Sequence, residues 1–246
     1  MEEDKKIWHS VSCSGGKDST ALVIGMWEKG YQIDEILAAD EGKWWDEAYH
    51  VLDQITEITG IPVTIIDPPR SFDHLMFDRV ITRGKRKGTK GYGWPTALNR
   101  WCTTFCKARP LDAHRKRKED EGYHIINYIG IAADEAHRAE KEGGVAKLDK
   151  RFPLIDWGWT EADCLQFCYD NGITFGGLYE HFSRLSCWCC PLHTIQELRD
   201  LYHFYPEKWE ELKDMDDRSR NKYSDAGSVR ELEERFKRED AQGRLF

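Results

Sequence analysis

The segment Ser14-Gly15-Gly16-Lys17-Asp18-Ser19-Thr20 has the composition of a loop that binds an anion. It lies between an apolar run over 7–13, predicted to be a strand, and a predicted helix over about 19–29. At such a turn, backbone N–H groups and the helix N-terminus point at one place, which favours a phosphate. The glycines allow close approach, Lys17 adds positive charge and the hydroxyls add donors. The spacing is not that of a Walker A loop, and a tight turn without a ligand is the disfavoured alternative.

The eight cysteines are the second group of residues with chemical potential. Cys102 and Cys106 form a C-x3-C pair, and Cys187 and Cys190 form a C-x2-C pair. The chain shows no apolar segment of signal-peptide length before its first strand, so we expect a cytoplasmic protein without disulfides. Four thiolates from two pairs suit either a four-cysteine zinc site or an iron–sulfur cluster. Spacing alone does not choose between these metals.

The remaining cysteines receive other assignments. Cys189 is an alternative to Cys190 as the fourth ligand. We expect Cys13, at the end of the first strand, and Cys164 and Cys168, four residues apart on a helix, to be ordinary buried residues.

The elements that must position these groups alternate between strand and helix. A strand over 33–39, a helix with apolar residues at helical spacing over 45–58 and a strand over 62–66 follow the first helix. This β-α-β-α-β order predicts an α/β fold with a parallel twisted sheet and helices on both faces, a Rossmann-like architecture. Further elements are expected at 72–81 (helix), 110–121 (helix), 124–132 (strand) and 160–171 (helix with Thr160 as N-cap).

The chain becomes mainly helical and strongly charged after Pro191. We therefore divide it into a nucleotide-binding domain with the cysteine site (residues 1–191) and a helical C-terminal extension (residues 192–246). The last 20 or so residues are expected to form a loosely held helix or tail.

The net charge of −8 gives no general support for a nucleic-acid partner. Locally, however, residues 83–90 form a basic, glycine-spaced loop, which suits a loop that closes over a polyanionic substrate as well as it suits a mobile loop. Tyr92 and Trp94 after it are candidates for stacking on a base. For the basic run 115–118 we favour a solvated helix face. No stretch reaches the roughly 18 apolar residues that span a membrane, so no membrane association is expected.

Four motifs occur in the order typical of one protein family. The loop resembles the PP-loop of N-type ATP pyrophosphatases, and the later motifs resemble the branch related to phosphoadenosine-phosphosulfate (PAPS) reductase. These later motifs are Arg100-Trp101-Cys102 with Lys107 and Pro110-Leu111, Gly130-Ile131-Ala132-Ala133-Asp134-Glu135-Ala136-His137-Arg138, and Phe152-Pro153-Leu154-Ile155-Asp156-Trp157. The resemblance covers about residues 7–191 and implies an adenine nucleotide alpha hydrolase-like fold that binds an adenine nucleotide.

The resemblance also implies roles for individual residues. Asp40 and Gly42 stand where the family has D-T-G, with Glu41 replacing the threonine, which would put Asp40 near the nucleotide or Mg²⁺; a turn-forming aspartate is an equal alternative. Lys107, Asp134 and Arg138 would reach the phosphates or the transferred group, or else form surface ion pairs. The implied catalytic residues are Lys17, Asp18, Lys107 and Arg138. The implied nucleotide-binding residues are Ser12, Ser14, Gly15, Gly16, Lys17, Asp18, Ser19, Thr20, Asp40, Gly42, Gly130 and Asp134.

The family's reductases hold a [4Fe–4S] cluster with a Cys-Cys pair and a later C-x2-C, which implies Cys102, Cys106, Cys187 and Cys190 as cluster ligands here, with Thr103 replacing the second cysteine. Reductases that release sulfite use a nucleophilic cysteine in a C-terminal motif, and no cysteine follows Cys190. We therefore do not expect that activity.

The chemistry implied instead is that of an ATP pyrophosphatase, in which an acceptor attacks the α-phosphate of ATP, pyrophosphate leaves, and sulfur or nitrogen displaces the adenylyl group. The chain is similar in this respect to the ATP pyrophosphatase component of DNA phosphorothioation systems. A nucleic acid and a small molecule both stay open as the acceptor, and a sulfur-donor protein and a homo-oligomer stay open as partners. The alternatives are a sulfonucleotide reductase and a non-catalytic nucleotide-binding protein with a structural zinc site.

Overall fold

The computed structural model describes residues 5–142, 149–185 and 187–243. Its strands are β1 (Ile7–Ser12), β2 (Glu35–Ala39), β3 (Val63–Ile66), β4 (His124–Ile129) and β5 (Asp149–Arg151). Its α-helices are α1 (Lys17–Glu28), α2 (Asp46–Thr59), α3 (Arg109–Asp120), α4 (His137–Glu142), α5 (Pro153–Asp156), α6 (Glu161–Asp170), α7 (Ile195–Phe204), α8 (Pro206–Arg218) and α9 (Val229–Gly243). Short turns of other helix types are the π-helical η1 (His74–Asp78) and η2 (Thr103–Ala108) and the 3-10 helices η3 (Ala133–Glu135) and η4 (Phe175–Glu180).

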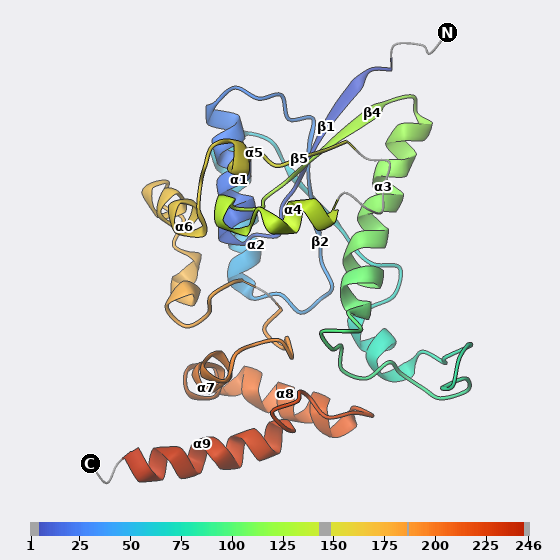
Figure 1. Ribbon diagram of the computed structural model, residues 1–246, viewed down its shortest axis with the longest axis vertical. Helices are drawn as coiled ribbons and strands as arrows, with labels where there is room; N and C mark the ends of the chain where they lie inside the picture. The colour runs from blue at the N-terminus through green and yellow to red at the C-terminus, as the bar shows by residue number, and fades with distance from the viewer. Residues whose placement is uncertain (1–4, 143–148, 186, 244–246) are drawn as a thin grey trace.

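The five strands form one parallel sheet in the order β3-β2-β1-β4-β5. Helices α1 and α2 pack together on one face with α6, whereas α3 packs on β2 and β4 from the other face (Figure 1). The predicted α/β fold with a parallel sheet covered on both faces is confirmed. Because β1 is central, its carboxyl end, where the phosphate loop begins, lies in the middle of the sheet edge at which ligands bind in this class of fold.

Local sequence accounts for the main helices. Helix α2 buries Ala48, Val51, Leu52 and Ile55 at helical spacing and ends at Gly60, which has a left-handed backbone. Helix α6 begins at Thr160, as predicted, with a reciprocal capping box between Thr160 and Asp163.

Two cores stabilise the chain. The first lies between the sheet and helices α1, α2 and α6. The second joins the C-terminal helices α7–α9 to residues from η1, from 94–106 and from 178–189. It therefore takes residues from both sides of the predicted boundary at 191, and α7–α9 lie beyond the carboxyl end of the sheet (Figure 1).

Two predicted segments differ from the structure. The expected helix over 72–81 is helical only from 72 to 78, mostly as the π-helical η1, after which Val80 pairs with Lys90 in an antiparallel bridge. The β-branched run that begins at Val80 favours extended backbone. The end of the chain is not loosely held over the described part of α9, because Val229, Leu232 and Phe236 are buried in the second core. No helix in the described ranges is long and apolar enough to cross a membrane.

Candidate active site

The phosphate loop lies between β1 and α1, where the sequence places it. Gly15 has a left-handed backbone (φ 72°), and a Cβ there would lie 3.1 Å from the carbonyl oxygen of Ala48. Gly16 is the N-cap of α1 and has no side chain that could accept from the first helical amides. These amides are therefore left to other partners, the Tyr179 hydroxyl for Lys17 and, where one binds, an anion.

The loop serines hold the loop itself together. The Ser14 amide donates to Ser19 Oγ (3.1 Å), and Ser19 Oγ donates to the Gly16 carbonyl (3.0 Å). Ser14 is exposed and is available to a ligand, whereas Thr20 is fully buried beneath the loop. Ser12 also faces elsewhere, because its hydroxyl accepts a hydrogen bond from Arg115 (2.7 Å) on the α3 side of the sheet.

Lys17 is buried at the loop and is held by residues far along the chain. Its Nζ lies 2.8 Å from Glu161 Oε2 and 3.3 Å from the carbonyl oxygen of Ser183. Its amide donates to the hydroxyl of Tyr179 (2.7 Å). A phosphate in the loop would compete with the Tyr179 hydroxyl for this amide and with Glu161 for the ammonium group.

Asp18 shares the same electrostatic environment. Its carboxylate lies 3.8 Å from Lys17 Nζ, and its buried Oδ1 has no hydrogen-bond partner in the described part of the chain. Burial raises the pKa of Asp18 to about 6, against the attraction of Lys17 and with a further contribution from Glu161. An unpartnered carboxylate oxygen beside the phosphate loop suits a Mg²⁺ ion that accompanies a nucleotide.

The residues after β4 surround the loop without filling it. A Cβ at Gly130 would lie 3.0 Å from the backbone of Asp18, so this glycine lets β4 approach the loop. Asp134 accepts a hydrogen bond from the first amide of α6 (3.1 Å), and the exposed Arg138 pairs with Glu135. Asp134 and Arg138 thus contact neighbouring protein groups, which was the predicted alternative to binding the phosphates.

Asp40 is used within its own turn. Its Oδ1 accepts from the Gly42 amide and its Oδ2 from the Tyr49 hydroxyl, both at 2.6 Å. Asp40 thus makes the contacts of a turn-forming aspartate.

Glu41 joins the carboxyl end of β2 to the cysteines. Its side chain is fully buried, and its Oε2 lies 3.1 Å from Lys107 Nζ and accepts from the indole N–H of Trp44 (3.1 Å). Its Oε1 contacts Cys187 Sγ. Lys107 therefore lies at the cysteines and not at the phosphate loop. Desolvation opposes its charge, but the acidic groups of Cys187 and Glu41 outweigh desolvation and raise the pKa of Lys107.

The two cysteine pairs come together in space. Cys102, Cys187 and Cys190 line one small pocket of about 110 Å³, together with Lys107 and Arg184. Burial raises the pKa of the Cys102 and Cys187 thiols, and the charge of Lys107 offsets only part of this effect. Lys107 Nζ lies 3.9 Å from Cys187 Sγ.

Cys106 lies behind this pocket. It is fully buried one helical turn from Cys102, and burial raises the pKa of its thiol to about 12. Cys189 is buried in the second core, whereas Cys190 lines the pocket. Among the described residues, no group of three or more His, Cys, Asp or Glu side chains is arranged to hold a metal ion. The donor set thus suits a thiolate-bound metal, but its atoms would have to move together and lose protons on binding.

A hydrogen-bonded path connects the two parts of the site. Ser183, whose carbonyl contacts Lys17, donates its amide (2.9 Å) and its hydroxyl (2.7 Å) to Glu197. Glu197 contacts His193, whose other ring nitrogen lies 3.2 Å from the Cys187 carbonyl. The phosphate loop and the cysteine turn are thereby held by one set of polar contacts.

Several of these residues were not predicted. The sequence around Glu41 could have pointed to a site, because a second acidic residue directly after a buried strand is unusual for a turn. No local sequence pattern pointed to Tyr179, Glu161 or Ser183, since each reaches the loop only through the tertiary fold. The prediction that Cys13, Cys164 and Cys168 are ordinary buried residues is confirmed, since all three lie in the first core.

Comparison with known proteins adds the family context. A sequence model of the phosphoadenosine phosphosulfate reductase domain matches residues 9–193, which include the phosphate loop and both cysteine pairs. Two similar curated proteins are the uncharacterized proteins MJ0973 and MJ0066 of Methanocaldococcus jannaschii. MJ0973 is 24% identical over 216 residues (85% of this chain, 48% of that protein), and MJ0066 is 24% identical over 217 residues (83% and 40%). The chain spans less than half the length of these relatives.

Proposed function

Because the chain belongs to the phosphoadenosine phosphosulfate reductase domain family, we propose that it binds ATP or a related adenine nucleotide at residues 14–20 and cleaves it at the α-phosphate to activate an acceptor for sulfur transfer. The observation that supports this best is the buried Lys17 ammonium at the N-terminus of α1, where the N-cap is a glycine.

The residues at the loop suit the charges of this reaction. When an acceptor oxygen attacks the α-phosphorus, the bond to the bridging oxygen breaks and pyrophosphate leaves with the electron pair. Lys17 and the amides at the start of α1 would neutralise that developing charge. The carboxylate of Asp18 would hold the Mg²⁺ that accompanies the nucleotide.

The test measures pyrophosphate and the adenylylated strand after incubation with ATP, Mg²⁺ and a mixture of short DNA and RNA strands. We expect Lys17→Met to abolish product formation and Lys29→Met to leave it unchanged, because Lys29 is at the other end of α1 and packs over Trp157. Release of ADP and phosphate would contradict cleavage at the α-phosphate. Nucleotide binding without turnover would favour a non-catalytic binding protein.

A second part of the proposal is that Cys102, Cys106, Cys187 and Cys190 hold a [4Fe–4S] cluster. Three of these cysteines line one pocket beside three cationic side chains, Arg100, Lys107 and Arg184, which favours this assignment. Such a cluster would supply redox or sulfur-carrying chemistry next to Lys107 and Glu41.

The protein purified without oxygen is expected to show a broad absorbance near roughly 400 nm and about four irons per chain. Cys187→Ser should lose both, whereas Cys164→Ser, in the first core, should keep them. About one zinc per chain and no colour would instead assign a structural zinc site. Sulfite formation from a sulfonucleotide and a thiol reductant would favour the reductase alternative.

A further inference from the structure

Positive charge is concentrated in one stretch of this acidic chain. Residues 66–117 contain thirteen lysines and arginines but only four aspartates and no glutamate, although the whole chain carries a net charge of −8. The stretch runs from the end of β3 through η1 and η2 into α3. A local excess of this size marks a surface that attracts polyanions.

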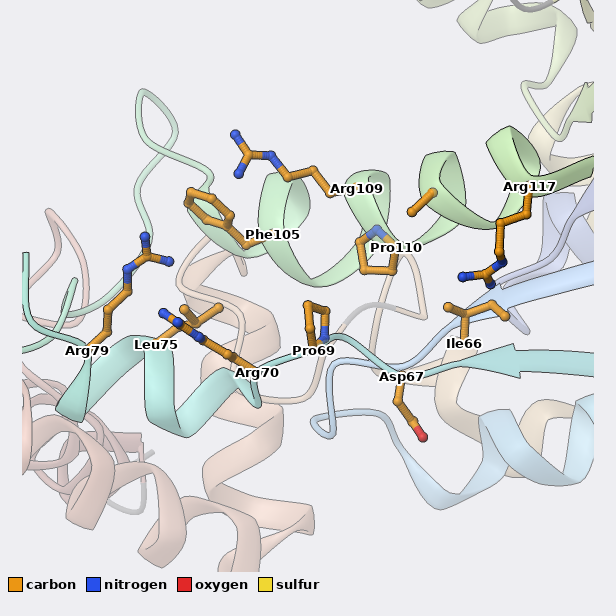
Figure 2. A pocket seen from close by; sticks show the side chains of 11 residues that line it. Ile66, Asp67, Pro69, Arg70, Leu75, Arg79, Phe105, Arg109, Pro110 and Arg117 are labelled. Carbon is orange, nitrogen blue, oxygen red and sulfur yellow. The ribbon is translucent and has the colours of Figure 1, made fainter. Parts of the chain in front are cut away.

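Part of this charge lines a pocket of about 600 Å³ between α3 and the segment that follows β3. Arg70, Arg79, Arg109 and Arg117 lie around it, with Phe105 among them (Figure 2). The one carboxylate of the lining, Asp67, points away from the other labelled side chains in Figure 2. The pocket is therefore cationic.

These arginines have no acidic partners. None of the four lies within 4.0 Å of a carboxylate oxygen in the described part of the chain, whereas Lys116 on the same helix lies 2.7 Å from Asp120. Arg79 and Arg109 instead pack on Phe105. Their guanidinium carbons lie 5.1 and 4.4 Å, respectively, from the centroid of its ring. Stacking of this kind orients a guanidinium while leaving its N–H groups free to donate to a ligand.

The charged surface continues from the pocket into a hairpin. Arg79 lies at the base of the hairpin, where its carbonyl accepts from the Gly91 amide (2.8 Å) and its neighbour Val80 pairs with Lys90. The hairpin exposes its basic side chains, and none of them has a carboxylate partner within the described residues: Arg83, Lys85, Arg86, Lys87 and Lys90.

The length of this surface identifies the class of ligand. Arg109 and Arg117 are eight residues apart on one helix, which places them about 12 Å apart along its axis. In Figure 2 the guanidinium groups of Arg109 and Arg117 point in different directions, and the hairpin extends the surface further. Repeating phosphates on a polymer would satisfy the whole row of arginines.

We propose that the pocket and the hairpin 79–91 bind the sugar–phosphate backbone of a single-stranded nucleic acid. This binding does not depend on the proposed nucleotide chemistry. The site is separate from the phosphate loop, since no residue of the loop lines the pocket.

The test measures binding of a fluorescent 20-nucleotide RNA and of the DNA of the same sequence by anisotropy, without ATP, at several salt concentrations. Arg70→Gln/Arg117→Gln is expected to weaken binding about tenfold and to lower the salt slope by about two. The matched control is Arg230→Gln/Arg235→Gln, which removes the same charge from two exposed, ion-paired arginines of α9. Both variants should melt at the wild-type temperature.

The control variant should bind like the wild type. Equal weakening in both variants would overturn the proposal, because only net charge would then matter. Absence of binding to both strands at low salt would also overturn it. Displacement of the strand by inorganic tripolyphosphate at the same concentration of phosphate groups would assign the pocket to a short polyphosphate instead.

Discussion

At the scale of single residues, the phosphate loop was readable from the sequence and its partners were not. The glycines, Lys17 and the serines are contiguous, so their types and order predict the loop directly. Glu161 and Tyr179, which contact Lys17, lie more than 140 residues further along the chain. Their contribution depends on how α6 and η4 pack against α1, which no local pattern encodes.

Asp18 should make stability depend on pH. Its folded pKa of about 6 exceeds that of an unfolded aspartate, so the folded state binds the proton more readily between about pH 4 and pH 6. Stability should therefore fall as the pH rises through this window. Asp18→Asn should stabilise the ligand-free protein by about 1–2 kcal/mol at pH 7.5 and should make little difference near pH 4. Urea unfolding at both pH values checks this, and an equal effect at both would contradict it.

Substitutions of Glu41 and Lys107 should affect the free energy of unfolding in a strongly non-additive way. Lys107→Met leaves the fully buried Glu41 carboxylate without its cation and should cost about 2–3 kcal/mol of stability. The double variant Lys107→Met/Glu41→Gln should recover most of that loss, because no uncompensated charge remains. Chemical denaturation of the four proteins of this cycle measures the coupling. Additive losses would show that the pair does not interact.

At the scale of elements, the helices and strands with clear periodicity were predicted, and the irregular ones were not. The apolar spacing of α2 and the capping residues of α6 are local signals. Strand β5 has three residues, too few for a period, and its sequence Asp149-Lys150-Arg151 has no β-propensity. The π-helical form of η1, within the helix predicted over 72–81, and the whole of η2 were missed for a related reason: their hydrogen bonding is set by what they pack against.

The basic hairpin offers a test of backbone geometry. Gly91 has φ 66°, and a Cβ there would lie 2.2 Å from the carbonyl oxygen of Met76. Gly91→Ala should therefore cost about 3 kcal/mol or more, since backbone must move as well as adopt a strained conformation. Gly88→Ala is the matched control: it has φ 86° but nothing within 4 Å, so it should cost only about 1 kcal/mol. Thermal unfolding compares the two, and similar losses would show that the Gly91 contact does not matter.

At the scale of the whole molecule, the two cores divide the chemistry between them. The first core supports the phosphate loop, whereas the second contains Trp101, Cys106 and Cys189 together with the C-terminal helices. The sequence predicted the C-terminal helices but not that they complete the enclosure of the cysteines. Helical periodicity shows that a face is apolar; it does not show which surface that face covers.

Phe236→Ala should open the second core while leaving the first core largely closed. Phe236 is fully buried, with its ring centroid 5.8 Å from those of Tyr202 and Trp209, and its loss should cost about 3–4 kcal/mol. We expect Cys106 and Cys189 to react faster with a thiol reagent, with a smaller change at the cysteines of the first core, because the second core opens locally. Mass spectrometry of the labelled peptides measures this. Equal acceleration at Cys164 and Cys168 would show that the cores open as one unit.

The second core also sets an order of events during synthesis. All strands and helices of the first core have left the ribosome before α9 is made, so the phosphate loop can reach its final form on the nascent chain. The second core, which contains Cys106 and Cys189, is complete only once α9 has been added. Until then these two thiols lack part of the packing of their core, which exposes them to oxidants.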